Sequence, residues 1–197
     1  MRIMRIGGVV ALGLTLAACS KAPTSDIDEA KSALAEARQA QAADYAPQSW
    51  TAAQDAEAKL EVELDAQQQK WSALRSYTTA KQLAMETKAA AERSRDEAIA
   101  GKEQAKNEAT TMMAQAREEV SRAQSAVNTA PQGKGTEADL AGLKSDASGI
   151  DATLEEMQRA FDAGDYVTAK AKAQAATDAA KQIQADIDAA KSARRAT

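Results

Sequence analysis

The sequence predicts an all-α protein made of long antiparallel helical hairpins that pack like a coiled coil. Alanine makes up about a quarter of the 197 residues, aromatic residues are 3%, and there are 9 Gly and 3 Pro. Ala, Glu, Lys, Gln and Arg favour helices, whereas β-branched and aromatic residues are too few for a sheet. Large apolar residues are sparse and recur at three- and four-residue steps. We therefore expect thin seams between helices instead of a globular core.

Residues 1–18 have the layout of a signal peptide. Arg2 and Arg5 precede an uncharged apolar run from Ile6 to Ala18, and small residues lead to Cys19. The run is shorter than the roughly 20 residues that cross a bilayer. We expect it to be cleaved.

Leu16-Ala17-Ala18-Cys19 resembles the lipobox of bacterial lipoproteins. The resemblance implies cleavage before Cys19, a thioether-linked diacylglycerol on its thiol, and acylation of the new amine. Ser20, and not Asp, follows Cys19, which implies the outer membrane facing the periplasm and not the inner membrane. Residues 19–24 would form the lipidated tether. The alternative is an ordinary signal peptide with an incidental cysteine, although a lone Cys in an exported protein would then be a reactive thiol.

Three helices are predicted in a first unit, residues 25–130. The first covers 25–45, with Ser25 as its cap, and ends at Tyr45-Ala46-Pro47 because proline cannot continue the helical hydrogen bonds. The second covers 47–74 and carries Trp50 and Trp71 on one stripe, three heptads apart. The third covers 77–130 after a turn at Arg75-Ser76, with Ser76 as its cap. A continuous helix from 47 to 130 is the alternative, because neither Gly nor Pro marks that turn.

The distal part of the third helix carries a heptad seam. The predicted seam consists of Ile99, Met113, Val120 and Val127 at one core position and Ala109, Ala116 and Ala123 at the other, interrupted by Lys106.

A repeat relates this unit to the end of the chain. Tyr77-Thr78-Thr79-Ala80-Lys81 and Tyr166-Val167-Thr168-Ala169-Lys170 share the pattern Tyr-x-Thr-Ala-Lys at an offset of 89 residues. Residues 131–135, with Pro131, form a linker, and residues 136–194 form a second hairpin with its turn at Gly164 and Asp165 as the next cap. Two related hairpins joined by a Pro/Gly linker are therefore expected.

Several residue types that carry chemistry are missing. The chain has no His, and its one Cys is assigned to the lipid, which excludes a Ser-His-Asp triad, a cysteine nucleophile and a zinc site of His or Cys ligands. The densest acidic cluster, from Asp55 to Asp65, has the spacing of a solvated helix face. Because 29 acidic residues outnumber 25 basic ones, no nucleic-acid partner is expected. We predict no enzyme activity, no metal and no cofactor apart from the covalent lipid.

Residues from about 28 to 91 resemble the small helical domain of unknown function family 4398 of bacterial envelope lipoproteins. The residues that carry the resemblance are Ala37, Tyr45-Ala46-Pro47, Trp50, Ala53, Leu60 and Tyr77 to Ala84, with an echo at Phe161, Ala163 to Tyr166 and Ala169. Arg75-Ser76 departs from the Gly-Asp that members often have. The resemblance implies an envelope location and no assigned activity.

The sequence thus predicts a non-enzymatic, lipid-anchored periplasmic protein that is a structural element or an adaptor. Its partners would be the membrane, through the lipid, and a protein or a second copy of itself, through the helical seams. The alternative is a binding module with a groove lined by Trp50, Trp71 and Tyr77 for a lipid, glycan or peptide.

Overall fold

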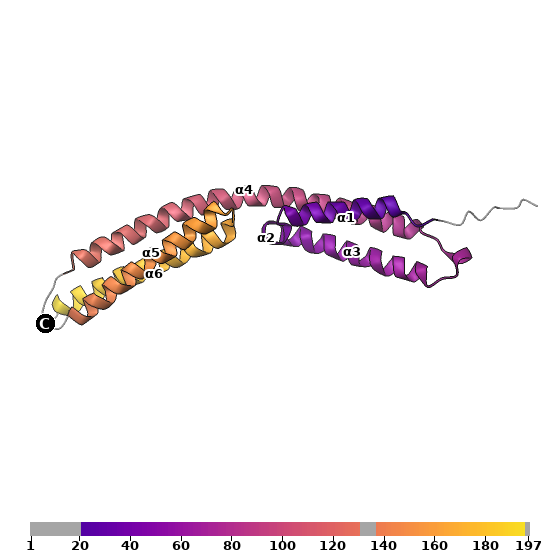
Figure 1. Cartoon of the computed structure of the whole chain (residues 1–197). Coiled ribbons are helices and arrows are strands. Elements are labelled where there is room, and N and C mark those ends of the chain that lie inside the picture. The colour runs from indigo at the N-terminus through magenta and orange to yellow at the C-terminus, as the bar shows by residue number, and fades with distance from the viewer. Residues whose placement is uncertain (1–20, 131–136, 196–197) are drawn as a thin grey trace, which may run out of the picture.

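The protein is an all-α rod organised around one long helix. The structure, a computed structural model, describes residues 21–130 and 137–195, in which every regular element is helical. Helix α4 (Thr78–Asn128) runs the length of the rod, as Figure 1 shows. Helices α1 (Thr24–Gln39), α2 (Ala42–Tyr45) and α3 (Pro47–Gln68) pack on its first half, and α5 (Glu137–Asp162) and α6 (Tyr166–Arg195) pack on its second half.

The predicted first helix, 25–45, is interrupted. It ends at Gln39, and Gln41 adopts a left-handed conformation (φ 58°) before α2 begins. This backbone is uncommon for a residue with a side chain. The Gln41 amide oxygen accepts a hydrogen bond from Lys102 Nζ at 2.6 Å, a tertiary contact that propensity does not reveal. Ser25 lies inside the first turn of α1 and caps nothing, so the predicted cap is wrong.

The predicted second helix is also too long. Helix α3 begins at Pro47, as predicted, but ends at Gln68 and not at residue 74. The guanidinium of Arg75 donates to the carbonyls of Gln68 and Lys70 at 3.0 Å each, which satisfies the carbonyls at the end of α3. A short 3₁₀ helix, η1 (Ser72–Leu74), lies in the connection to α4.

The turn before α4 exists, so the continuous helix from 47 to 130 is excluded. Ser76, however, does not cap α4 with its side chain, because the residue before the helix is Tyr77 and no side-chain cap bond is present there. The backbone amide of Ser76 instead donates to Gln67 Oε1 at 3.0 Å. Side-chain to backbone bonds define this turn, which explains why neither Gly nor Pro was needed.

The buried seam of α4 changes register where its partners change. Six of the predicted seam residues are buried: Ala109, Met113, Ala116, Val120, Ala123 and Val127. Ile99 is 58% exposed and Lys106 is exposed, so the predicted seam is wrong there. The buried residues are Ala98 and Ala105, one position earlier. Ala98 and Ala109 are eleven residues apart, a spacing that an undistorted helix keeps on one face better than a strict heptad does.

The hairpin of α5 and α6 turns at Gly164, as predicted. Gly164 has φ 76°, the Asp165 amide donates to Ala160 O at 2.9 Å, and the Gly164 amide donates to Phe161 O at 3.0 Å, which is a Schellman motif. Asp165 Oδ1 accepts a hydrogen bond from the amide of Thr168 at 3.0 Å and caps α6, as predicted. The seam buries three residues of α5 against six of α6: Ala147, Ile150 and Met157 against Ala169, Ala173, Ala176, Ala180, Ile183 and Ile187.

The offset of 89 residues has a structural meaning. Six buried positions of α4, Ala80, Ala84, Thr87, Ala91, Ser94 and Ala98, correspond at this offset to the six buried positions of α6 just named. The rod therefore consists of two segments that share α4 and that each contain three long helices. The first segment contains α1, α3 and the first half of α4, with the four-residue α2 between α1 and α3, and the second contains the second half of α4, α5 and α6.

Candidate functional site

The predicted lipidation site lies outside the described residues. Leu16, Ala17, Ala18 and Cys19 precede residue 21, where the described part of the chain begins. The start of α1 lies at the same end of the rod as the connection between α3 and α4 (Figure 1). Among the described helices, none is both long and apolar enough to span a bilayer.

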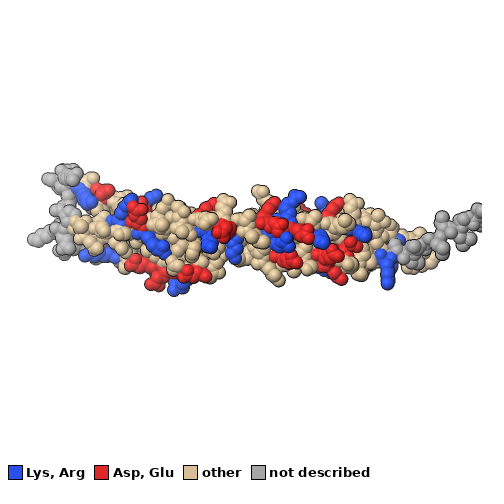
Figure 2. Space-filling model, turned by 90° about the horizontal axis from the view of Figure 1, so that it is seen from above, with Lys and Arg blue, Asp and Glu red and all other residues tan. Residues whose placement is uncertain are grey.

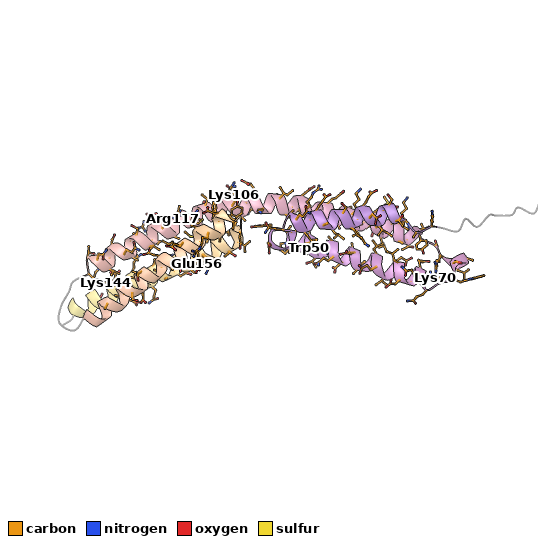
Figure 3. All side chains as sticks on the ribbon, viewed as in Figure 1. Trp50, Lys70, Lys106, Arg117, Lys144 and Glu156 are labelled. Carbon is orange, nitrogen blue, oxygen red and sulfur yellow. The ribbon has the colours of Figure 1, made fainter. Side chains whose placement is uncertain are left out.

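The predicted aromatic groove is not formed. Trp50 is 9% exposed and packs between α1, α3 and α4 with Leu34, Ala53 and Ala91. Trp71 is 75% exposed and lies beyond the end of α3. Figure 3 shows Trp50 and Lys70, the neighbour of Trp71, toward opposite ends of α3. Tyr77 is half-buried against the separate cluster of Leu60, Ala80 and Ala84.

The early end of α3 explains this correction. The three-heptad spacing of Trp50 and Trp71 would align them only on a continuous helix. Because α3 ends at Gln68, Trp71 no longer follows its periodicity. Trp50 is a core residue, with the Arg38 guanidinium carbon 5.6 Å from its ring centroid.

A polar site lies at the junction between the two segments. The Tyr45 hydroxyl donates to the carbonyl of Gly164 at 3.1 Å and accepts from the amide of Tyr166 at 3.2 Å. One side chain of the first segment thus satisfies a donor and an acceptor of the α5–α6 turn. In the sequence Tyr45 is predictable only as part of the corner before Pro47, because its partners at the junction lie 119 and 121 residues away.

Close backbone packing brings Tyr45 to this position. A Cβ atom on Gly101 of α4 would lie 2.4 Å from the carbonyl oxygen of Tyr45, so α2 approaches α4 at a point where only glycine fits. Lys102 Nζ lies 5.7 Å from the Tyr45 ring centroid. Phe161 packs on Tyr166 with ring centroids 5.2 Å apart. The junction therefore holds the two segments in a fixed relation.

Burial and hydrogen bonding shift two pKa values at the junction. Burial raises the pKa of the Tyr45 hydroxyl, which outweighs the lowering effect of the amide of Tyr166. Hydrogen bonds from the side chain and the amide of Thr168 lower the pKa of Asp165. Both shifts favour the protonation states that this geometry needs, a neutral phenol and a charged cap.

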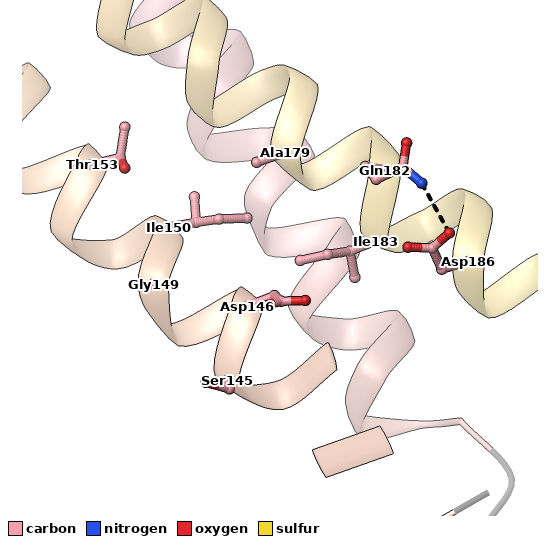
Figure 4. Close-up of a pocket in the computed structure, with 9 residues that line it drawn as sticks. All are labelled: Ser145, Asp146, Gly149, Ile150, Thr153, Ala179, Gln182, Ile183 and Asp186. Carbon is pink, nitrogen blue, oxygen red and sulfur yellow. Dashed lines mark hydrogen bonds between the residues drawn. The ribbon is translucent and has the colours of Figure 1, made fainter. Parts of the chain in front are cut away.

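An open groove lies between α5 and α6. It has a volume of about 410 Å³ and is lined by Ile150 and Ile183 at its floor and by Asp146, Gln182 and Asp186 at its edges, together with Ser145, Gly149, Thr153 and Ala179. Gln182 and Asp186 bond to each other at 2.9 Å along α6, as Figure 4 shows. The polar groups thus lie at the rim of an open furrow.

Ion pairs between helices are exposed and structural. Lys88 pairs with Glu29 at 2.8 Å and Arg95 with Glu36 at 2.7 Å, and Lys170 pairs with Glu108. Hydrogen bonding to the lysines lowers the pKa of Glu29 and of Glu108. Exposed pairs of this kind contribute little to stability. Figure 2 shows both signs of charge interspersed along the visible face of the rod.

In residues 21–130 and 137–195, no group of three or more Asp, Glu, Cys or His side chains is arranged to hold a metal ion. Comparison of the chain with protein-family models, with curated proteins and with solved structures finds no match. The resemblances to the lipobox and to family 4398 therefore stay predictions.

Proposed function

We propose that the protein is a non-enzymatic lipoprotein of the bacterial outer membrane, a rod that extends into the periplasm as a spacer or adaptor. A lipid on Cys19 would hold one end, and the helical faces would bind a protein partner or a second copy. The observation that carries the proposal is Leu16-Ala17-Ala18-Cys19, which ends five residues before α1 begins. That spacing attaches the lipid to one end of the rod and not to its middle.

The shape of the molecule supports a spacer or adaptor. Helix α4 has 51 residues, which at 1.5 Å per residue makes it about 76 Å long. The described chain begins at one end of the rod, and α6 ends at the other (Figure 1). Helix α4 runs through both segments, and Tyr45 adds two hydrogen bonds between them, so a partner at the far end would be held at a distance from the membrane that the length of the rod sets.

Localisation of the wild type and two variants in a Gram-negative host tests the anchor. We expect the wild type in the outer membrane, Cys19→Ala released from membranes, and Ser20→Asp shifted to the inner membrane. Circular dichroism of all three should show the same helix content, since residues 19 and 20 precede the helical body. If Cys19→Ala still fractionates with the outer membrane, the lipid anchor is wrong.

Cross-linking in intact envelopes tests the adaptor. Exposed lysines along the rod, including Lys70, Lys106 and Lys144, are suitable for an amine-reactive reagent. We expect intermolecular links to one protein, or between copies of this chain, that cluster on one side of the rod. A monomer with intramolecular links alone would contradict the adaptor while leaving the anchor intact.

A further inference from the structure

The connection between α3 and α4 presents two large apolar side chains at the end of the rod. Trp71 is 75% exposed and Leu74 is 70% exposed, and they are among the most exposed large apolar residues of the described chain. Trp71 directly precedes η1 and Leu74 is its last residue, and Lys70 beside them is exposed as well. We call residues 70–74 the apolar tip.

The apolar tip is a built turn. Arg75 bonds the carbonyls of Gln68 and Lys70, and Leu74 N donates to Trp71 O at 2.8 Å. Gln67 is buried, and its amide holds Ser76 N on one side and Glu63 Oε1, at 2.7 Å, on the other. These bonds fix the backbone while Trp71 and Leu74 remain outside the core. The indole is therefore available to a surface outside the protein.

The start of α1 lies beside this tip. Ile27 of α1 packs in the same cluster as Leu64 and Tyr77, and Asp26 lies 4.0 Å from Lys81 at the start of α4. The beginning of α1 is therefore next to the turn. Cys19 precedes Thr24 by five residues, which span at most about 17 Å when extended.

The side chains of the tip have the chemistry of a lipid interface. Tryptophan is enriched where headgroups meet acyl chains, because its ring is apolar and its N–H needs a polar partner. Lysine can extend its amine to the headgroups while its stem stays in the apolar layer. Lys70, and Lys21 in the tether, add positive charge that anionic lipids attract.

We propose that the apolar tip inserts Trp71 and Leu74 into the membrane surface next to the lipidated Cys19, so that the rod stands on the bilayer at two points. This rests on the proposed anchor, which brings the tip within reach of the bilayer. A single flexible tether would leave the rod free to tilt, whereas a second contact sets its direction. The occupant of the tip is thus a lipid surface, and not a protein partner.

Tryptophan quenching in vesicles tests the proposal with the full chain. Trp50→Phe leaves Trp71 as the only tryptophan, and Trp71→Phe leaves the buried Trp50 as a matched control. Each protein, purified from membranes, is reconstituted into phosphatidylethanolamine and phosphatidylglycerol vesicles with or without acyl-chain bromine. We expect brominated lipid to reduce Trp71 emission about twofold, as for an indole at the headgroup level, and to leave Trp50 emission unchanged.

A second control distinguishes a standing rod from one that lies flat. Val167 is exposed at the start of α6, near the middle of the rod. Val167→Trp in a Trp50→Phe, Trp71→Phe background should be quenched by acrylamide and not by brominated lipid. Lipid quenching at position 167 equal to that at Trp71 overturns the proposal, and so does a Trp71 that acrylamide quenches equally with and without vesicles. Protection of Trp71 without vesicles would instead show a protein or a second copy on the tip.

Vesicle flotation separates the two proposals. A chain that does not float with vesicles contradicts the anchor, whereas a chain that floats with an unquenched Trp71 contradicts the tip alone. If the native chain does not float, it can be attached to the same vesicles by coupling Cys19, the only thiol in the sequence, to maleimide phospholipid. The tip is then next to the bilayer whether or not the chain carries its own lipid. The same quenching experiment then tests whether Trp71 inserts.

Discussion

The two three-helix segments bury the same positions and fill them with different side chains. Six positions of α4 and six of α6 correspond at the offset of 89 residues. In the first segment these include Thr87 and Ser94, whereas the second has Ala176 and Ile183 there. The second segment also contributes Met113, Val120 and Met157 to its core. The packing of the helices thus depends on which positions carry small or apolar residues, and the volumes of the core side chains differ between the two segments.

The turns of the two segments differ more than their seams. The turn at Gly164 is short and lies against Tyr45, where its free backbone groups are satisfied. The turn of residues 69–77 lies at the end of the rod. Its backbone groups are hydrogen-bonded by the neighbouring side chains of Gln67 and Arg75. The difference follows from position, because a turn inside the rod must fit a neighbour and a turn at its end need not.

The largest effects should come from truncating one core at a time. Leu34→Ala and Met157→Ala each remove a fully buried side chain, one from each segment, and each should cost about 2–5 kcal/mol. Urea unfolding measures the loss. Hydrogen exchange should increase mostly in α1 and α3 for Leu34→Ala and mostly in α5 and α6 for Met157→Ala, because the clusters are separate. Equal exchange in both segments would show that the rod unfolds as one unit.

A smaller but position-specific loss is expected at Gly101. In Gly101→Ala the new Cβ would lie 2.4 Å from the Tyr45 carbonyl oxygen, and overpacking of this kind costs about 3 kcal/mol. Gly149→Ala is the matched control, because its Cβ would meet nothing within 4 Å, and a helical alanine gains about 1 kcal/mol over glycine. Thermal unfolding should shift in opposite directions. If both variants gain stability, α2 does not approach α4 as described.

Tyr45→Phe should lower the free energy of unfolding by about 1–2 kcal/mol, because the turn between α5 and α6 loses two hydrogen bonds. The variant also tests the raised pKa of Tyr45. A phenol with a raised folded-state pKa contributes stability that is fully present below the unfolded-state pKa, about 10, and is lost as the pH rises through the folded-state pKa. Unfolding of the wild type should therefore become easier above pH ~10. The difference in unfolding free energy between the wild type and Tyr45→Phe should become smaller in this alkaline range. A constant difference from neutral to alkaline pH would contradict the raised pKa of the part-buried Tyr45 hydroxyl.

Local pattern was sufficient for the all-α class and insufficient where distant residues act. The start of α4 was predicted with a continuous helix from 47 to 130 as the alternative, because neither Gly nor Pro marks it. The hairpin at Gly164 was predictable because a glycine and a capping aspartate are signals within one segment. The end of α3 was not, because a helix former such as Gln68 is followed by an arginine seven residues later that satisfies its carbonyl. The one-residue shift between Ala98 and Ala109 depends on which helices lie beside α4 at each point.

The predicted site shows the same limit. The spacing of Trp50 and Trp71 was real in sequence, but it becomes a shared face only if the helix continues between them. Tyr45 was visible as a corner residue, yet its function depends on Gly164, in another segment. The predicted lipobox is different, since a linear motif can be predicted without any fold, and it stays a prediction.

The smallest effect should come from Ser94, where the comparison of the segments is sharpest. Among the described residues, Ser94 Oγ is the only buried side-chain nitrogen or oxygen atom without a hydrogen-bond partner. Thr87 Oγ1, by contrast, donates to Leu83 O at 2.8 Å. Burying an unsatisfied hydroxyl costs stability, so Ser94→Ala should gain about 1 kcal/mol. Thr87→Ala, which removes a satisfied hydroxyl and a packed methyl, should gain nothing. Urea midpoints of both variants measure this difference. A gain at Ser94 would mean that the first segment can accept the apolar pattern of α6 at that position, whereas a loss would mean that the hydroxyl contributes to packing that the second segment achieves with Ile183.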